Sequence, residues 1–152
     1  MTVEEEIFPE TPHAVAIGMH ADALPDGAPA MRLRYADHLI GDPDTGVLHG
    51  GVITALLDQT AGMVARPEGK PRGEAAIATL DLRIDYMGPA TPGRDLWATG
   101  ECYKRTRNIA FVRAWAFHDS PDDPVATCVA AFMLDTPNTP RAGSVAPSED
   151  PA

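Results

Sequence analysis

The chain has 152 residues, the size of one ordinary domain, which excludes separate cofactor-binding and substrate-binding domains. Its formal net charge is −10 and it has no cluster of Lys and Arg, so we expect it to bind neither nucleic acid nor an anionic membrane surface. The N-terminal segment is acidic and no apolar run approaches membrane-spanning length. These features predict a cytoplasmic protein without a signal peptide or a membrane span.

The composition divides the chain into three parts. Residues 1–12 are acidic and contain two Pro, which predicts a loose N-terminal arm. Residues 136–152 are rich in Pro, Ala and Ser, which predicts a disordered C-terminal tail. The folded domain is therefore expected to comprise residues 13–135.

The first half of this domain predicts two strands and one long helix. Residues 16–23 and 28–35 are expected to be strands joined by a turn at Pro25-Asp26-Gly27, and residues 41–46 a loop. Residues 52–65 contain no Pro and end before Pro67, as expected of a helix. Apolar residues occupy every face of this segment, which predicts a buried helix. The polar residues that interrupt it are Thr54, Asp58, Gln59 and Thr60.

Four further strands are predicted after the helix, at residues 79–86, 95–104, 109–118 and 125–134. In the first of them polar and apolar residues alternate strictly, which places Thr79 on the polar face, opposite to Leu80 and Tyr86. Because short turns join consecutive strands, the sheet is expected to be antiparallel. We therefore predict an α+β fold in which a curved sheet wraps around the helix and a second subunit closes the site.

Several common chemistries are excluded by the residues present. The three Ser lie in a turn or in the tail and no G-x-S-x-G occurs, which argues against a serine hydrolase. No glycine-rich phosphate-binding loop is found. The five His are scattered without metal-ligand spacing, so no metal is expected. Cys102 and Cys128 lie in apolar segments and are expected to be buried thiols, not a disulfide or a metal pair.

Asp58 is the main candidate for chemistry, since it lies in the middle of the apolar helix. A buried carboxylate must be paired, hydrogen-bonded or protonated, so a purely structural role is an equal alternative. Asp58 shares one helical face with small residues, which would let another backbone or a slender ligand approach closely. Gly50 and Gly51 precede the helix directly, and their amides would lie where the helix dipole favours a developing negative charge. Such amides can form an oxyanion hole, although a tight turn would also need glycine.

The segment His49-Gly50-Gly51 followed by Asp58 resembles the H-G-G-x6-[DE] signature of PaaI-like hotdog-fold thioesterases. Residues 79–90 resemble the strand that follows the helix in that family, and residues 105–111 resemble its next hairpin. The resemblance covers most of residues 40–134 and implies a hotdog-fold acyl-CoA thioesterase. Coenzyme A would be part of the substrate, and no separate cofactor is implied.

The resemblance also implies roles for individual residues. Asp58 would act as general base or nucleophile on the thioester, and the Gly50 amide would polarise its carbonyl. His49 would orient the loop or contact the substrate, and Thr79, supplied by the opposite subunit, would help to hold the water. The site would form between two subunits of a homodimer or homotetramer. Further contacts with the substrate or CoA are implied for Gly51, Asp42, Gln59, Arg107 and Asn108.

One position departs from the family pattern, and two other functions remain open. Many relatives have Asn in the loop before the histidine, where this chain has Gly41-Asp42-Pro43-Asp44, so that role is absent or falls to Asp42. A hydratase or dehydratase of the same fold would need a different histidine loop, which this chain lacks. A non-catalytic acyl-CoA-binding protein would not need both Asp58 and the paired glycines.

Overall fold

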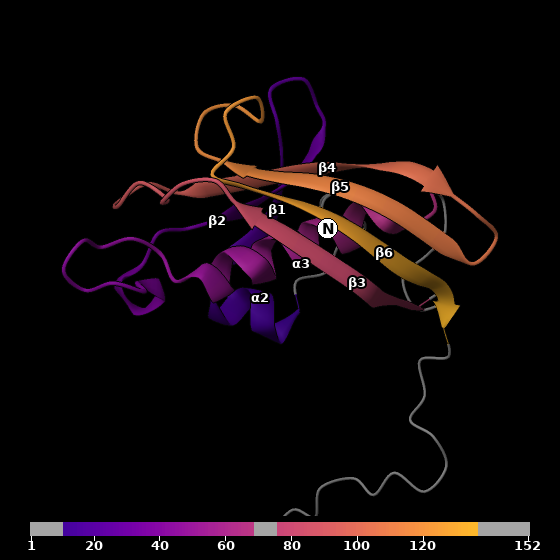
Figure 1. Cartoon of the computed structure of the whole chain (residues 1–152), viewed down its shortest axis with the longest axis horizontal. Coiled ribbons are helices and arrows are strands. Elements are labelled where there is room, and N and C mark those ends of the chain that lie inside the picture. Colours follow the sequence, from indigo (N-terminus) through magenta and orange to yellow (C-terminus); the bar gives the residue numbers. More distant parts are fainter. Residues whose placement is uncertain (1–10, 69–75, 137–152) are drawn as a thin grey trace, which may run out of the picture.

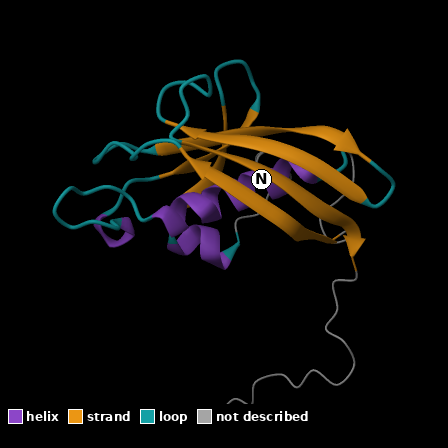
Figure 2. Cartoon of the chain, in the orientation of Figure 1, coloured by secondary structure: helices purple, strands orange, loops and turns teal. Residues whose placement is uncertain are grey.

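The computed structural model describes residues 11–68 and 76–136, which form one antiparallel sheet packed against one long helix (Figures 1 and 2). Helix α3 lies along one face of the sheet, and the short helix α2 lies beside it (Figure 1). Within the described residues no helix has the length and apolar character needed to cross a membrane. The elements are α2 (Pro12–Ala16), β1 (Met19–Ala23), β2 (Pro29–Leu33), the 3-10 helix η1 (Asp37–Leu39), α3 (Gly50–Ala65), β3 (Ala76–Tyr86), β4 (Leu96–Arg105), β5 (Ile109–Phe117) and β6 (Ala126–Thr136).

The six strands are ordered β1-β2-β4-β5-β6-β3, and every neighbouring pair is antiparallel. Strand β3 therefore lies at the edge of the sheet and pairs on one side only, with β6. The helix-facing positions of β4 to β6 are mostly alanine, and this lets α3 approach the sheet closely. Leu56, Leu57 and Ala61 of α3 are completely buried in the resulting core.

The predicted fold class is confirmed, with differences in detail at the element boundaries. The helix begins at Gly50, two residues earlier than predicted. The predicted strand at residues 16–23 is wrong at its start, because Ala16 ends helix α2 and Gly18 with φ +73° turns the chain into β1. Thr11 caps α2 by accepting the Ala14 amide at 3.2 Å, so the predicted arm is structured from residue 11. Thr136 lies in β6; the rest of the predicted arm and tail falls outside the described residues.

A β-bulge in β3 changes which way Thr79 faces. Thr79 pairs with Phe132 and Asp81 with Ala131, so Leu80 is an extra residue in the ladder. Cross-strand partners lie on the same side of a sheet, and Phe132 is buried on the side that faces α3. Thr79 consequently faces the helix, and its predicted position on the opposite, polar face is wrong. Leu80 is 52% exposed.

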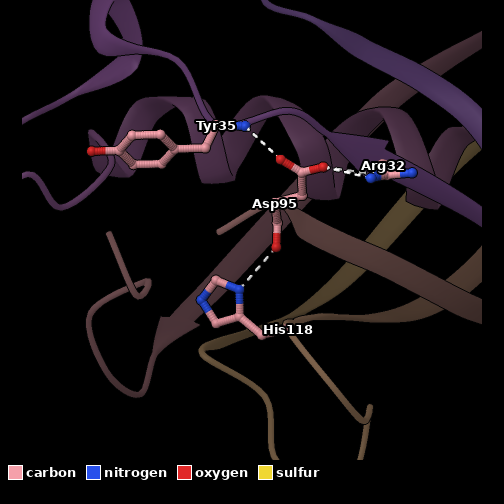
Figure 3. Close-up of polar contacts among 4 residues, drawn as sticks. All are labelled: Arg32, Tyr35, Asp95 and His118. Carbon is pink, nitrogen blue, oxygen red and sulfur yellow. Dashed lines mark hydrogen bonds and ion pairs between the residues drawn. The ribbon is translucent and has the colours of Figure 1, made fainter. Parts of the chain in front are cut away.

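A group of polar contacts around Asp95 ties strand β2 to the start of β4 (Figure 3). The Asp95 carboxylate accepts the Tyr35 amide at 3.0 Å and two bonds from the Arg32 guanidinium, at 2.7 and 3.0 Å. His118 Nδ1 lies 2.9 Å from the Asp95 carbonyl oxygen, and His118 Nε2 accepts the Thr91 amide at 2.8 Å. Since Nε2 accepts, the proton of the neutral ring is on Nδ1 and is donated to Asp95.

These contacts predict a pH-dependent contribution to stability. Burial of Asp95 opposes its ionisation, but the Tyr35 amide and the Arg32 guanidinium outweigh burial and hold the pKa of Asp95 below its ordinary value. A carboxyl with a lowered pKa stabilises the fold above the unfolded-state pKa of about 3.9, and this contribution is lost as the pH falls through the folded-state pKa.

We therefore expect Asp95→Asn to lower the free energy of unfolding by about 1 kcal/mol at pH 7, because a partly exposed pair is screened by solvent. Urea unfolding at pH 7 and at pH 3 measures the difference, which should shrink at the lower pH. Asp119→Asn is the control, because Asp119 pairs with Arg94 at 2.6 Å on the open surface. An equal loss in the two variants would contradict a special role for Asp95.

Candidate active site

The first part of the site is the start of α3, which His49 caps. His49 has an extended backbone, and its Nδ1 accepts the Gly51 amide at 2.9 Å. Because Nδ1 is the acceptor, the neutral ring carries its proton on Nε2, which becomes a hydrogen-bond donor. The His49 side chain is exposed. The preceding loop packs tightly here, since a Cβ on Gly41 would lie 2.7 Å from His49 Cα, a distance that only glycine permits.

The Gly50 amide points out of the helix start without a hydrogen-bond acceptor anywhere in residues 11–68 and 76–136. The Gly50 carbonyl, in contrast, accepts hydrogen bonds from one residue of β3 and from one residue of the next helical turn. Tyr86 Oη donates to it at 2.9 Å and Thr54 Oγ1 at 3.1 Å, and the two hydroxyls lie 2.6 Å apart. The free N–H belongs to the preceding His49–Gly50 peptide, whose carbonyl oxygen accepts the Val52 amide at 2.9 Å. That bond fixes the orientation of the N–H at the positive end of the helix dipole.

The second part of the site is Asp58, two turns further along α3. Thr79 Oγ1 donates to Asp58 Oδ1 at 2.9 Å, and among the described residues Thr79 alone donates to this carboxylate. Both side chains line a pocket between α3 and the edge of the sheet. Asp58 is half-buried and Thr79 exposed, so water reaches the carboxylate. The two residues belong to one chain, so the prediction that the opposite subunit brings Thr79 to Asp58 is wrong.

Cys128 lies on the helix-facing side of β6, within the electrostatic reach of Asp58. Burial raises the pKa of the Cys128 thiol to about 11; a backbone hydrogen bond at Ala114 opposes this shift, and the negative charge of Asp58 adds to it. A thiol with this pKa stays protonated at neutral pH and is a poor nucleophile. Cys102 and Cys128 are both free, as predicted, although Cys102 is only half-buried.

The other predicted residues are distributed around these two parts. Gln59 lines the pocket beside Asp58. Asp42 instead shapes its own loop: Oδ2 accepts the Thr45 hydroxyl at 2.8 Å, Oδ1 accepts the Asp44 amide at 3.0 Å, and these bonds hold the pKa of Asp42 below its ordinary value. Arg107 and Asn108 form the exposed turn between β4 and β5.

The sequence did not predict four residues of the site. The alternation placed Tyr86 only on the apolar face of its strand, whereas its side chain is 53% exposed and lies over the start of α3. Ile77, Phe132 and Arg66 line the Asp58 pocket. Of these four residues, only Tyr86 could have been predicted from the sequence. A tyrosine at the end of an edge strand has a hydroxyl that usually forms a hydrogen bond.

The comparisons with known proteins decide the family. The profile of the thioesterase superfamily matches residues 45–125, which is more than half of the chain. The chain belongs to the thioesterase superfamily. It is a thioester hydrolase with the hotdog fold, and the match includes the start of α3 together with Asp58 and Thr79.

Individual relatives agree with this assignment. The Escherichia coli medium/long-chain acyl-CoA thioesterase YigI is 25% identical over 130 residues, which cover 78% of this chain and 83% of that protein. A Pseudomonas aeruginosa crystal structure has 40% identity and a TM-score of 0.65 over 80% of this chain and 88% of its own. A Bacillus halodurans protein, crystallised with CoA, shares the fold with 23% identity and a TM-score of 0.71 over 83% of this chain and 80% of its own.

Proposed function

We propose that the protein hydrolyses an aryl or acyl CoA thioester to the free acid and CoA, with Asp58 as the general base. The observation that carries this proposal is the Asp58 carboxylate, which Thr79 orients at 2.9 Å in a pocket open to water. Asp58 takes a proton from a water molecule, whose oxygen forms a bond to the thioester carbon. The C–S bond then breaks, and the thiolate of CoA leaves and takes up a proton.

A second route, in which Asp58 attacks the thioester itself, gives the same products. The two routes differ in a single turnover in 18O-labelled water. If Asp58 is a general base, the labelled oxygen of the water enters the released acid directly. If Asp58 forms an anhydride, water can attack the Asp58 carbonyl carbon, and the label then remains in the protein. Mass spectrometry of the peptide that contains Asp58 after one turnover therefore distinguishes the two routes. An unlabelled peptide is expected.

The tetrahedral intermediate needs a donor for its oxygen, and the Gly50 amide is suited to this role because it has no acceptor among the described residues and its peptide is fixed at a helix start. It is too far from Asp58 of the same chain. Eight residues of α-helix separate Gly50 from Asp58, a rise of about 12 Å. The path from the amide through the carbonyl and the water to the base has three contacts of about 3 Å each, and because it is bent at the carbonyl carbon it is shorter than this rise. Gly50 and His49 of one subunit therefore act together with Asp58 and Thr79 of another.

The edge strand β3 offers the surface on which such a pair of subunits would form. Three apolar side chains on or directly after this strand are exposed to solvent: Leu80 is 52%, Tyr86 53% and Met87 60% exposed. An unpaired strand edge with exposed apolar residues is a template for pairing with a second chain. Pairing there would bring the start of α3, under Tyr86, close to the partner's Asp58. We propose a homodimer through β3; further assembly into a tetramer and a cytoplasmic location stay predictions.

The CoA part of the substrate is supported by the relatives. YigI is named an acyl-CoA thioesterase and the Bacillus halodurans structure is with CoA. In this chain the exposed turn between β4 and β5 supplies a cation, Arg107, and an amide, Asn108, both suited to contacts with the phosphate groups of CoA. Release of free thiol from benzoyl-CoA and hexanoyl-CoA tests the proposal. Tight binding of both without release would instead favour the non-catalytic acyl-CoA-binding alternative.

Thr79→Val should lower kcat about tenfold or more, because it removes a hydrogen bond to a charged group and leaves the attacking water less well placed. Valine has the shape of threonine, so the fold should be kept. Thr79→Ser keeps the hydroxyl and should stay within a few-fold of the wild type. Steady-state kinetics of the three proteins measure the effect. A Val variant as active as the Ser variant would show that this hydroxyl has no part in the reaction.

A further inference from the structure

Tyr86, at the end of the edge strand β3, has a hydroxyl that contacts the glycine start of α3. Its Oη lies 2.9 Å from the Gly50 carbonyl oxygen and 2.6 Å from Thr54 Oγ1. The ring also covers Gly50, since a Cβ built there would lie 3.6 Å from Tyr86 Cε1. A phenylalanine would cover Gly50 equally well, so the hydroxyl is the feature of this side chain that needs a role.

The three polar contacts at this point share only two hydroxyl protons. Thr54 Oγ1 lies 3.1 Å from the same Gly50 carbonyl oxygen, so each hydroxyl donates either to that oxygen or to the other hydroxyl. In either arrangement the Tyr86 hydroxyl is bonded to the first turn of α3. The Thr54 bond joins two residues of one helical turn and moves with the helix. Tyr86 belongs to the sheet, so its hydroxyl ties the helix start to a separate support.

The start of α3 needs such a support because two glycines form it. Glycine has the greatest backbone freedom of all residues, and the first amides of a helix have no helical acceptor. The direction of the Gly50 N–H depends on the two peptide groups that flank Gly50. The His49 carbonyl oxygen, on the preceding peptide, accepts the Val52 amide at 2.9 Å, and Tyr86 contacts the carbonyl oxygen of the following peptide. With both peptides held, the N–H keeps one direction.

Strand β3 is thereby attached to α3 at both halves of the site. Thr79 of this strand donates to Asp58 at 2.9 Å, and Tyr86 of the same strand bonds to the helix start. Both side chains face α3, because their cross-strand partners on β6, Phe132 and Ala126, are buried on the helix side of the sheet. One strand therefore orients the base and the oxyanion donor alike.

We propose that Tyr86 is a positioning residue of the thioesterase reaction, whose hydroxyl holds the Gly50 N–H in the direction of the thioester oxygen. The inference rests on the proposed function and adds a residue that does not touch the reacting atoms. A misdirected N–H stabilises the tetrahedral intermediate less well, whereas binding of the substrate depends on contacts elsewhere. Loss of the hydroxyl should therefore lower kcat and leave KM almost unchanged.

Tyr86→Phe removes this hydroxyl and keeps the ring over Gly50. Its kcat for benzoyl- and hexanoyl-CoA should fall about tenfold, less than the complete loss of an oxyanion donor would cause. Thr54 can still donate to the Gly50 carbonyl, so the variant should fold. Tyr103→Phe is the matched control and should keep full activity. Tyr103 is an exposed tyrosine whose ring contacts Arg113 and whose hydroxyl has no partner among the described residues.

Two further readouts separate positioning from a general structural role. A methyl group at Gly50 restricts the backbone, so in the Gly50→Ala background Tyr86→Phe should lower kcat only about threefold or less. Hydrogen exchange measured by NMR reports the helix start without any substrate. In Tyr86→Phe it should be faster at the Gly51 amide, which His49 Nδ1 accepts at 2.9 Å, and unchanged at Leu57 in the middle of α3.

The outcomes separate this inference from the function on which it rests. A kcat of Tyr86→Phe equal to that of the control variant would overturn the inference while thioester hydrolysis stands. An equal loss with and without Gly50→Ala would also overturn it, because the hydroxyl would then act on the substrate directly. Faster exchange at Gly51 and Leu57 alike would show a general loss of stability instead of positioning. A wild type that hydrolyses no thioester would overturn the proposed function, whereas unchanged exchange at Gly51 overturns the role of Tyr86 whatever the activity.

Discussion

Asp58→Asn is expected to lower kcat for thioester hydrolysis by about 10²–10⁴, the contribution of a positioned general base. The substitution keeps the size and shape of the side chain. The carbonyl oxygen of the substituted amide can still accept the hydrogen bond that Thr79 donates to Asp58 at 2.9 Å. What is lost is the negative charge and, with it, the ability to take a proton from water. KM should change little, because Asp58 acts on the water and not on the substrate.

Two measurements make this result specific. Urea unfolding should show that Asp58→Asn is at least as stable as the wild type, because a partly buried charge has been removed. Asp123→Asn changes an exposed carboxylate in the turn before β6 and should keep full activity. If the folded Asp58→Asn protein hydrolyses benzoyl- and hexanoyl-CoA at the wild-type rate, Asp58 is a structural residue and the proposed mechanism is wrong.

Gly50→Pro should lower kcat by about 10²–10³, the usual cost of removing one oxyanion-hole donor. Proline removes the N–H at this position without breaking a helical hydrogen bond, since the first residue of a helix has no helical acceptor for its N–H and tolerates the fixed φ. The preceding residue His49 has ψ 132°, the extended conformation that a following proline requires. The variant is therefore expected to fold.

Gly50→Ala is the matched control because it keeps the N–H. A Cβ at Gly50 would lie 3.6 Å from the ring of Tyr86, an ordinary contact. Its kcat should stay within a few-fold of the wild type, and its near-UV circular dichroism should match that of Gly50→Pro. Equal losses in the Ala and Pro variants would attribute the effect to packing against Tyr86, and the Gly50 amide would then have no place in the mechanism.

The general fold and one half of the site followed from local sequence patterns. A continuous apolar segment predicts a buried helix, and paired glycines before it predict free amides at its start; both depend only on neighbours in the chain. The acidic residue in that helix, Asp58, was the natural candidate for the same reason. The antiparallel order of the later strands followed from their short turns.

The position of Thr79 could not be predicted, because it depends on a single extra residue in the pairing of β3 with β6. Strict alternation in the sequence placed Thr79 away from the helix, whereas the bulge at Leu80 turns it toward Asp58. Helix α2 was missed because five residues are too short for a helical period to show. The pocket beside Asp58 is lined by Ile77 of β3 and Phe132 of β6, so it depends on contacts between α3 and the sheet that no local pattern shows.

The division of one site between two subunits is the central claim, and mixing two inactive variants tests it most directly. Asp58→Asn and Gly50→Pro are each unfolded, mixed in equal amounts and refolded together, or co-expressed with different tags. Random pairing gives half mixed dimers, and each has one site with both Asp58 and Gly50 intact, so about a quarter of the wild-type activity should return. If both residues act within one chain, every site in the mixture lacks one of them, and the mixed protein will be no more active than its two parents.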